Sequence, residues 1–286
     1  ILIPPSVVLI VAAIVVEANI ETLFQAAFVP GLIATAGYMA AIAIVVRVWP
    51  ELGPAGPRAT AEEKLRALVD IWPVVFIFLL VIGGIYFGLF TPTEAASVGA
   101  VAMGIVAVTR GRMRLKGFTE AILETAVSTA MIFLILFAAN VLNAFLGFTR
   151  LPMALSEIMS GSGLSPMMIL IVMIAIFIIL GMFMDSMSMI LLFLPIFWPI
   201  LLVLDFGMSV EDLKIWFCIL TLMVAEMGLI TPPVGLNVFV INSMAGDVSM
   251  RDSFRGVLPF LISDFFRVGI LILFPGITLF LPHLLK

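Results

Sequence analysis

Long apolar stretches separated by short polar segments make up almost the whole sequence. The apolar runs cover residues 22–46, 71–87, 92–109, 119–148, 166–204, 215–243 and 257–282. A membrane-spanning helix needs about 20 predominantly apolar residues, and these runs are too many for one buried soluble core. The pattern therefore predicts an all-α integral membrane protein.

The segment 47–70 is the longest polar stretch. Its prolines and glycines between Pro50 and Pro57 interrupt any helix, and Ala61–Arg66 suits a short surface helix. So few residues cannot bury a core of their own. We predict a cytoplasmic loop over 47–70 and a membrane span over 71–87.

The tetrapeptide Thr91-Pro92-Thr93-Glu94 opens the predicted helix 92–109. Thr91 is placed to cap the first free amides, Pro92 suits the first helical position, and Glu94 is placed to reach back to the amide of Thr91. We therefore predict a capping box. The resulting helix is about 27 Å long at 1.5 Å per residue, just enough to cross a membrane.

One polar interruption divides the apolar run 166–204. Asp185-Ser186 falls at its middle, so the two arms form either two full spans or a re-entrant hairpin, and length alone leaves both open. A carboxylate at the centre of a bilayer costs roughly 2.5–3.5 kcal/mol or more. We hypothesise that Asp185 is functional and that Asp185 and Ser186 cap the returning half-helix of a hairpin, whose tip holds an anion and a cation. The alternative is a turn in cytoplasmic water.

A second interruption, Thr231-Pro232-Pro233-Val234-Gly235, breaks the predicted span 215–243. Two prolines remove two amide donors and free the carbonyls about four residues earlier, near Gly228 and Leu229. Na⁺ suits those oxygens, with the hydroxyl of Thr231 and the amide of Asn237 nearby. The alternative is a plain proline kink.

The same arrangement occurs near the start, where Pro4-Pro5-Ser6 precedes an apolar half-helix. The two Pro-Pro elements lie 228 residues apart, and an odd number of predicted crossings places them on opposite sides of the membrane. This is the pattern of an inverted-topology repeat, in which ions and substrate bind at corresponding broken helices. We assign residues 1–46 to the end of the first repeat and 71–286 to the second. Chance similarity of apolar sequence is the alternative.

Charged residues also fall within the last two predicted spans. Glu226 precedes the second Pro-Pro break and either neutralises a cation or packs as a protonated or hydrogen-bonded group. Asp264 and Arg267 are three residues apart on one helix face, so we predict that they pair inside the protein.

Composition and charge exclude several classes of protein and function. Only 11% of the residues are charged and 63% are hydrophobic, whereas soluble domains carry about 25% charged residues. No basic patch suits nucleic acid, and a single cysteine, Cys218, excludes a disulfide framework or a cysteine metal site. An intramembrane enzyme would need paired acids or a nucleophile with a base, which these residues do not provide.

Basic residues set the predicted orientation. The loops 47–70, 110–116 and 246–256 carry four, four and two Lys or Arg residues, Arg58 among them. Arg150, Lys214 and Lys286 fall on the opposite side. Because positively charged short loops stay in the cytoplasm, we place the three loops there.

Three motifs, Gly88–Ala96, Gly181–Asp185 and Glu226–Asn237, carry a resemblance to a known family. With Ile3–Ser6 and Phe24–Gly31, and in this order, they resemble the large permease (M, DctM-like) subunit of tripartite ATP-independent periplasmic (TRAP) transporters. The resemblance covers the whole chain. The family's subunit is longer, and the chain begins with Ile rather than Met, so we expect the sequence to be an N-terminally truncated part of it.

The resemblance implies an elevator-type transporter of a bacterial inner membrane. It implies Na⁺ as the coupling ion and no other cofactor, a small four-helix membrane subunit (Q), a periplasmic substrate-binding protein (P), and an organic acid such as a C4-dicarboxylate, a 2-oxo acid or a sialic acid as substrate. Carried onto this sequence, the expected ion- and substrate-binding residues are Pro4, Pro5, Ser6, Gly181, Asp185, Ser186, Gly228, Thr231, Pro232, Pro233, Gly235 and Asn237. We expect Na⁺ near Asp185 and Thr231.

Two other classes of function remain as alternatives. A Na⁺/anion symporter with a related inverted-repeat fold would work without a binding protein. A purely structural membrane subunit would leave the polar breaks at corresponding places unexplained.

Overall fold

The computed structural model describes residues 2–54, 56–57, 59–161, 163–245 and 248–285. These residues form helices and no strands. They divide into unit 1, residues up to Trp49 and from Ile135 onward, and unit 2, Pro50–Leu134. Arg58, Asp247 and Lys286, which belong to the loops and repeat considered above, lie outside the described residues.

Unit 2 contains the 3₁₀ turn η1 (Pro50–Leu52), α3 (Ala61–Tyr86), α4 (Pro92–Thr109) and the first part of α5 (Leu115–Thr149). The short surface helix predicted at Ala61–Arg66 and the span predicted over 71–87 form one continuous helix, α3, and the cytoplasmic position of 47–70 stays a prediction. Helix α3 begins at Ala61 because Thr60 and Glu63 form a capping box: Thr60 Oγ1 accepts from the Glu63 amide at 3.2 Å, and Glu63 Oε2 accepts from the Thr60 amide at 2.7 Å. The helix then continues through Pro73 to Tyr86.

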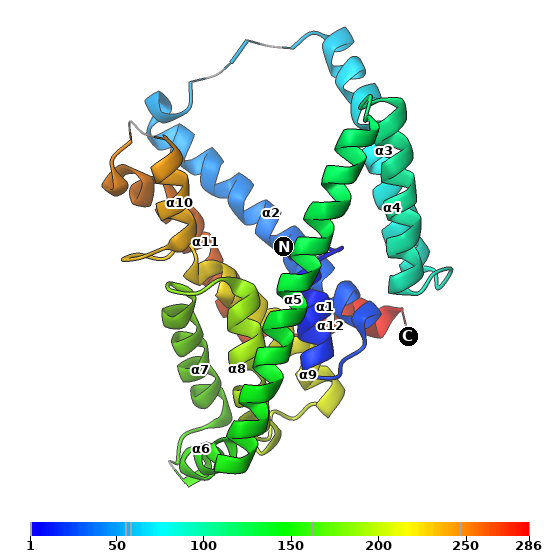
Figure 1. The fold of residues 1–286 in the computed structure, drawn as a ribbon. Coiled ribbons are helices and arrows are strands. Elements are labelled where there is room, and N and C mark those ends of the chain that lie inside the picture. Colours follow the sequence, from blue (N-terminus) through cyan, green and yellow to red (C-terminus); the bar gives the residue numbers. More distant parts are fainter. Residues whose placement is uncertain (1, 55, 58, 162, 246–247, 286) are drawn as a thin grey trace. The chain divides into compact units, whose positions relative to one another are not determined.

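The turn between α3 and α4 is held by Gly84. Its carbonyl accepts the amides of Leu89 and Phe90 at 2.8 and 3.1 Å. A Cβ atom at Gly84 would lie 2.3 Å from Phe90 Cδ2, so only glycine admits this ring. Gly88 has a φ of +68°, the left-handed conformation that glycine adopts freely. The two helices consequently pack side by side and antiparallel (Figure 1).

Unit 1 is organised around α9 (Val210–Gly228). Its side chains from Ile215 to Ala225 are all buried. Helices α1 (Val7–Val15), α2 (Ile20–Val48), α7 (Pro166–Gly181), α8 (Ser186–Leu202), α11 (Met250–Leu273) and α12 (Pro275–Leu284) all contact it. Helix α10 (Leu236–Ala245) packs against α11, and α6 (Leu151–Gly161) packs against α8.

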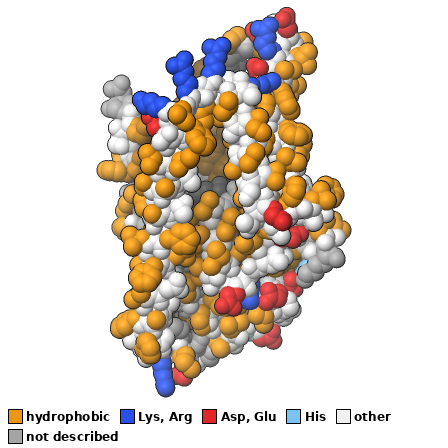
Figure 2. Space-filling view, turned by 45° about the vertical axis from the view of Figure 1, so that its right-hand side comes forward, with side chains coloured by type: hydrophobic (Ala, Val, Ile, Leu, Met, Phe, Trp, Pro, Cys, Tyr) orange, Lys and Arg blue, Asp and Glu red, His pale blue; other side chains and the backbone are white. Residues whose placement is uncertain are grey.

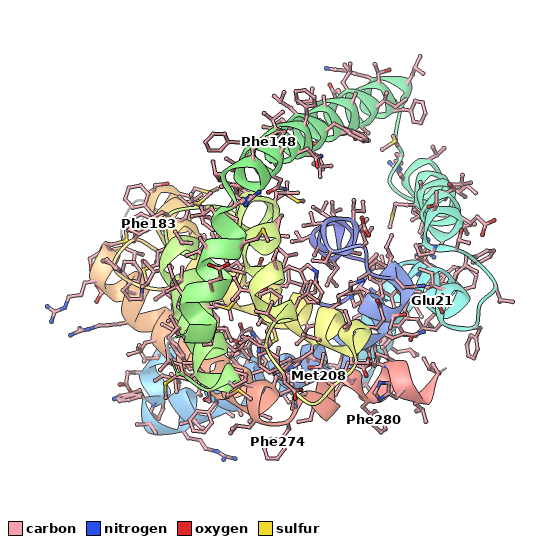
Figure 3. The ribbon with its side chains drawn as sticks, turned by 90° about the horizontal axis from the view of Figure 1, so that it is seen from below. Glu21, Phe148, Phe183, Met208, Phe274 and Phe280 are labelled. Atoms are coloured by element: carbon pink, nitrogen blue, oxygen red, sulfur yellow. The ribbon has the colours of Figure 1, made fainter. Side chains whose placement is uncertain are left out.

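Two features of unit 1 differ from the predicted spans. Helix α6 was not predicted; it follows Arg150, whose φ of +54° separates it from α5. The predicted last span, 257–282, is two helices that meet at Phe274, whose exposed ring points away from its neighbours (Figure 3). Pro275 causes the break because it has no amide hydrogen for the carbonyl of Leu271.

Helix bounds recur at a constant offset in unit 1. Helix α10 begins 229 residues after α1 (236 against 7), and α11 begins 230 residues after α2 (250 against 20). The second helix of each pair carries an internal proline, Pro30 in α2 and Pro259 in α11. This spacing supports the repeat, whose inverted orientation in the membrane stays a prediction. The two units do not follow the predicted repeat boundaries and do not test them.

Five helices of the described residues are long and apolar enough to cross a membrane: α2, α3, α4, α5 and α11. Large hydrophobic side chains such as Met39, Leu79, Phe133 and Phe266 are exposed. Hydrophobic side chains are spread across the face visible in Figure 2. Because soluble monomers rarely expose apolar areas of this extent, the chain is an integral membrane protein.

Candidate functional site

The predicted hairpin is formed by α7, a four-residue turn and α8, which pack against each other. Ser165 caps α7 by accepting from the Met168 amide at 3.3 Å. At 1.5 Å per residue, arms of 16 and 17 residues are about 24 and 26 Å long. These lengths lie at the short end of the roughly 17–25 residues that a membrane span needs, so the re-entrant hairpin stays a prediction beside two full spans.

Asp185 lies at the hairpin tip and is exposed. Its Oδ1 accepts the amides of Met187 and Ser188 at 3.0 Å each, and its Oδ2 accepts the hydroxyl of Ser188. The predicted capping role is therefore present. The sequence predicted free amides at the tip. The amides of Met187 and Ser188 are not free, because the carboxylate of Asp185 accepts a hydrogen bond from each of them. The ring of Phe183, in the same turn, points outward (Figure 3).

The second Pro-Pro element separates α9 from α10. The carbonyls expected to be free each accept one hydrogen bond: Gly228 O from the Thr231 amide and Leu229 O from the Asn237 amide, both at 3.0 Å. A turn thus replaces part of the lost helical bonding. Since a carbonyl oxygen has two lone pairs, each retains one for another ligand.

The hairpin tip contacts α9 immediately before its break. A Cβ atom at Gly228 would lie 2.6 Å from Gly181 Cα, and one at Gly181 would lie 3.1 Å from Gly228 Cα. Ser186, which is buried, donates its hydroxyl to Glu226 Oε1 at 2.7 Å. The structure therefore brings together Gly181, Ser186 and Gly228 of the predicted set, and adds Glu226 as a hydrogen-bonded partner.

The remaining predicted residues of the second break are arranged differently. The hydroxyl of Thr231 is buried and donates to Met227 O at 2.6 Å. Gly235 has a φ of +52° and is packed against the ring of Phe254. The side chains of Pro232, Pro233 and Asn237 are exposed. No hydrogen bond joins Asp185 to Thr231 in the part of the chain that the structure describes.

The first Pro-Pro element lies in the same unit. Ser6 is buried and caps α1, accepting from the Leu9 amide at 3.3 Å. Pro4 is buried and Pro5 is exposed. Helix α1 packs against both α8 and α9, so this element reaches the second arm of the hairpin and the helix before the second break.

The capping box at Thr91 has a structural role in unit 2. Glu94 Oε2 accepts from the amide and the hydroxyl of Thr91 at 2.8 Å each, and Thr91 Oγ1 accepts from the Glu94 amide at 3.3 Å. Pro92 occupies the first turn of α4, and Thr93 is exposed. These bonds fix the start of α4.

A buried charged cluster joins α2 to α11. Arg267 Nη2 lies 2.7 Å from Asp264 Oδ1, which confirms the predicted pair. Tyr38 donates its hydroxyl to Asp264 Oδ2 at 2.8 Å. The pair is close but not well directed, since Asp264 Oδ1 and Arg267 Nε form no hydrogen bond within the described residues.

The sequence did not predict hydrogen bonds between side chains that lie far apart in the chain. Ser186 and Glu226 are 40 residues apart, and Tyr38 and Asp264 are 226 apart. No local spacing signals such contacts. Among the described residues, no three His, Cys, Asp or Glu side chains gather as a metal site; the groups at the tip are oxygen donors of the hydroxyl, carboxylate and carbonyl kinds, which suit hard cations.

A helical hairpin packed against a proline-broken helix, among helices able to span a membrane, is typical of multi-pass membrane transport proteins. Residues 1–277 match the family described as tripartite ATP-independent periplasmic transporter, DctM component. The chain belongs to this family, which is a family of transporter permeases rather than enzymes. Its place is the bacterial inner membrane.

Curated relatives show how far the similarity extends. The C4-dicarboxylate TRAP transporter large permease protein DctM of Pseudomonas aeruginosa is 37% identical over 285 residues. The sialic acid TRAP transporter large permease protein SiaM of Vibrio cholerae is 30% identical over 288 residues. For both, the alignment covers 99% of this chain and 64% of the relative. The 2,3-diketo-L-gulonate TRAP transporter large permease protein YiaN of Escherichia coli is 28% identical over 284 residues, covering 97% of this chain and 64% of the relative. The chain thus spans less than two thirds of these proteins.

Proposed function

We propose that this chain is part of the large permease of a Na⁺-coupled TRAP-type symporter that imports an organic acid. The substrate would be delivered by a periplasmic binding protein, and a small four-helix membrane subunit would complete the transporter. The relatives named for a C4-dicarboxylate, a sialic acid and a diketo-gulonate support an acid of the C4-dicarboxylate, 2-oxo or sialic acid class.

The contact between Gly181 and Gly228 is the observation that carries this proposal. Helix α7 ends at Gly181 and α9 ends at Gly228, so two helix C-termini meet at one point. Each C-terminus carries about half a negative charge on its unpaired carbonyls. Converging carbonyl ends at an interrupted helix are the setting in which transporters hold Na⁺.

Two carboxylates strengthen the attraction for a cation. Glu226 is tied to the hairpin through Ser186, and Asp185, at the hairpin tip, caps the start of α8. The residues present therefore fit Na⁺, with Ser186, Glu226 and the Gly228 carbonyl as the groups that would hold it. The ion would supply a positive charge that offsets these acids.

Coupling to an acid substrate follows from that charge. Without the cation, an approaching carboxylate would be repelled by Glu226 and Asp185; with it, the repulsion is offset. Each ligand then raises the affinity for the other by the same factor. A hairpin that moves with the broken helices, as in an elevator, would carry both across.

Uptake by the complete transporter in proteoliposomes tests this proposal. The full-length permease would be reconstituted with its small subunit, and uptake of radiolabelled acid measured with an inward Na⁺ gradient, with and without the binding protein. We expect uptake only with Na⁺ and binding protein together. Uptake with Na⁺ that needs no binding protein would favour the alternative, a binding-protein-independent Na⁺/anion symporter.

A further inference from the structure

A groove of about 300 Å³ lies between α3 and α4 of unit 2, apart from the candidate transport site. Trp72 and Phe76 of α3 and Ala102 and Ile105 of α4 line it, and Arg110 lies at one end. The rings of Trp72 and Phe76 and the side chain of Ile105 are half or more exposed. The groove is therefore largely apolar and partly open, with the guanidinium of Arg110 at one end.

Arg110 is held at the end of the groove by the indole ring. Its Cζ lies 5.6 Å from the centre of the Trp72 ring, a cation–π distance. Arg110, Arg112 and Arg114 form no ion pair within the described part of the chain. Their positive charge is consequently available to a ligand.

The end of α4 does not cancel this charge. Val106 O accepts the amides of Arg110 and Gly111 at 2.9 and 3.2 Å, and Ala107 O accepts the amide of Met113 at 2.9 Å. The loop thus satisfies carbonyls that would otherwise repel an anion. Of the nearby acids, Glu120 pairs with Lys116 at 3.8 Å. Asp70 lies two residues before Trp72, which turns it about 200° around α3 from that ring.

From this geometry we propose that the groove and Arg110 bind an anionic phospholipid. Both walls belong to helices able to span a membrane, so in this proposal the groove faces hydrocarbon and holds part of one acyl chain. Trp72 marks the interface, where tryptophan is enriched. The headgroup phosphate then meets Arg110 and the basic loop, as in basic pockets between membrane helices on the cytoplasmic side. A soluble anion would gain nothing from the apolar walls.

Native mass spectrometry of the intact, detergent-solubilised chain tests the headgroup contact. Phosphatidylglycerol and phosphatidylcholine with identical acyl chains are titrated separately, and the bound fractions compared. We expect phosphatidylglycerol to bind more tightly. Arg110→Gln should weaken it about fivefold, the factor equivalent to about 1 kcal/mol per basic residue. Arg255→Gln, a matched control that removes an exposed arginine of α11, should leave it unchanged.

A second pair of variants tests the acyl-chain groove without changing charge. Ala102→Phe fills the groove and should weaken phosphatidylglycerol binding, whereas Ala100→Phe, on an exposed face of α4 outside the groove lining, should not. Equal binding of the two lipids, equal effects of the two arginine variants, or equal effects of the two phenylalanine variants would each overturn the proposal.

Discussion

Trp216 donates its indole N–H to the carbonyl oxygen of Leu271 at 2.8 Å, in the buried interface between α9 and α11. In a continuous helix the amide of residue 275 would donate to this carbonyl, but Pro275 has no amide hydrogen. A side chain 55 residues away thus completes the hydrogen bonding of a broken helix. Trp216 itself is fully buried.

Removing this donor should destabilise unit 1. Trp216→Phe leaves a buried carbonyl unsatisfied, which costs about 1–3 kcal/mol, and it also removes ring volume. We expect a lower melting temperature of the detergent-solubilised protein. In Trp216→Phe/Pro275→Ala, the new amide is able to bond to Leu271 O, so part of the loss should be recovered. This account would be contradicted if the double variant lost as much stability as Trp216→Phe and Pro275→Ala lose together.

The close approach of Gly181 and Gly228 should tolerate no added side-chain atom. In Gly228→Ala, the Cβ would lie 2.6 Å from both Cα and C of Gly181, and backbone atoms cannot rotate away as a flexible side chain would. We expect the hairpin tip to separate from α9 and substrate uptake to be lost. Gly269→Ala is the matched control, since nothing lies within 4 Å of its Cβ position. Equal uptake by the two variants would exclude a role for the contact.

The buried pair between Asp264 and Arg267 should be sensitive to loss of one partner. Asp264→Asn leaves the guanidinium buried without a counter-charge, and breaking such a pair costs about 3–5 kcal/mol. The control is Glu62→Gln, which removes an exposed ion pair with Arg66 that contributes about 0–1 kcal/mol to the free energy of unfolding. Thermal unfolding of both variants gives the comparison. Similar melting temperatures would show that the buried pair contributes no more than the exposed one.

Asp185→Asn separates charge from capping at the hairpin tip. Asparagine keeps the size and the acceptor oxygen that caps α8, so the protein should fold. If the charge helps to hold Na⁺, uptake should fall steeply at ordinary Na⁺ concentrations and recover partly at high Na⁺ by mass action. Asp205→Asn, at an exposed aspartate whose side chain accepts the Gly207 amide, is the control. Wild-type uptake and Na⁺ dependence in Asp185→Asn would refute this role.

The helices that the sequence predicted correctly are specified by residues close to them in the chain. The capping residues Thr91, Ser165 and Asp185 and the apolar periods lie within a few residues of the helices that they specify, so a sequence pattern is enough. The sequence predicted a short helix at Ala61–Arg66, but not its continuation into the span 71–87, because charged residues recur up to Asp70 before the apolar run begins. The break at Phe274 was missed because Pro275 lies within continuous apolar sequence.

The candidate site was only partly predictable for a different reason. Proline and glycine identify where the backbone is interrupted, but not which segments meet there. The bond from Ser186 to Glu226 depends on the packing of α8 against α9, which no spacing encodes. For the same reason the expected free carbonyls of Gly228 and Leu229 proved to be partly occupied by the turn that follows them.

Na⁺-dependent thermal stability measures the central claim, a cation site between the hairpin tip and the broken helix, without requiring any partner protein. A ligand that binds the folded state stabilises it in proportion to ln(1 + [L]/Kd). Melting of the purified chain would be followed from low to high NaCl, with choline chloride holding ionic strength constant. We predict that Na⁺ raises the melting temperature of the wild type. In Glu226→Gln, whose amide oxygen still accepts from Ser186, the rise should require several-fold more Na⁺. Identical melting in Na⁺ and choline, or identical titrations of the two proteins, would contradict the account.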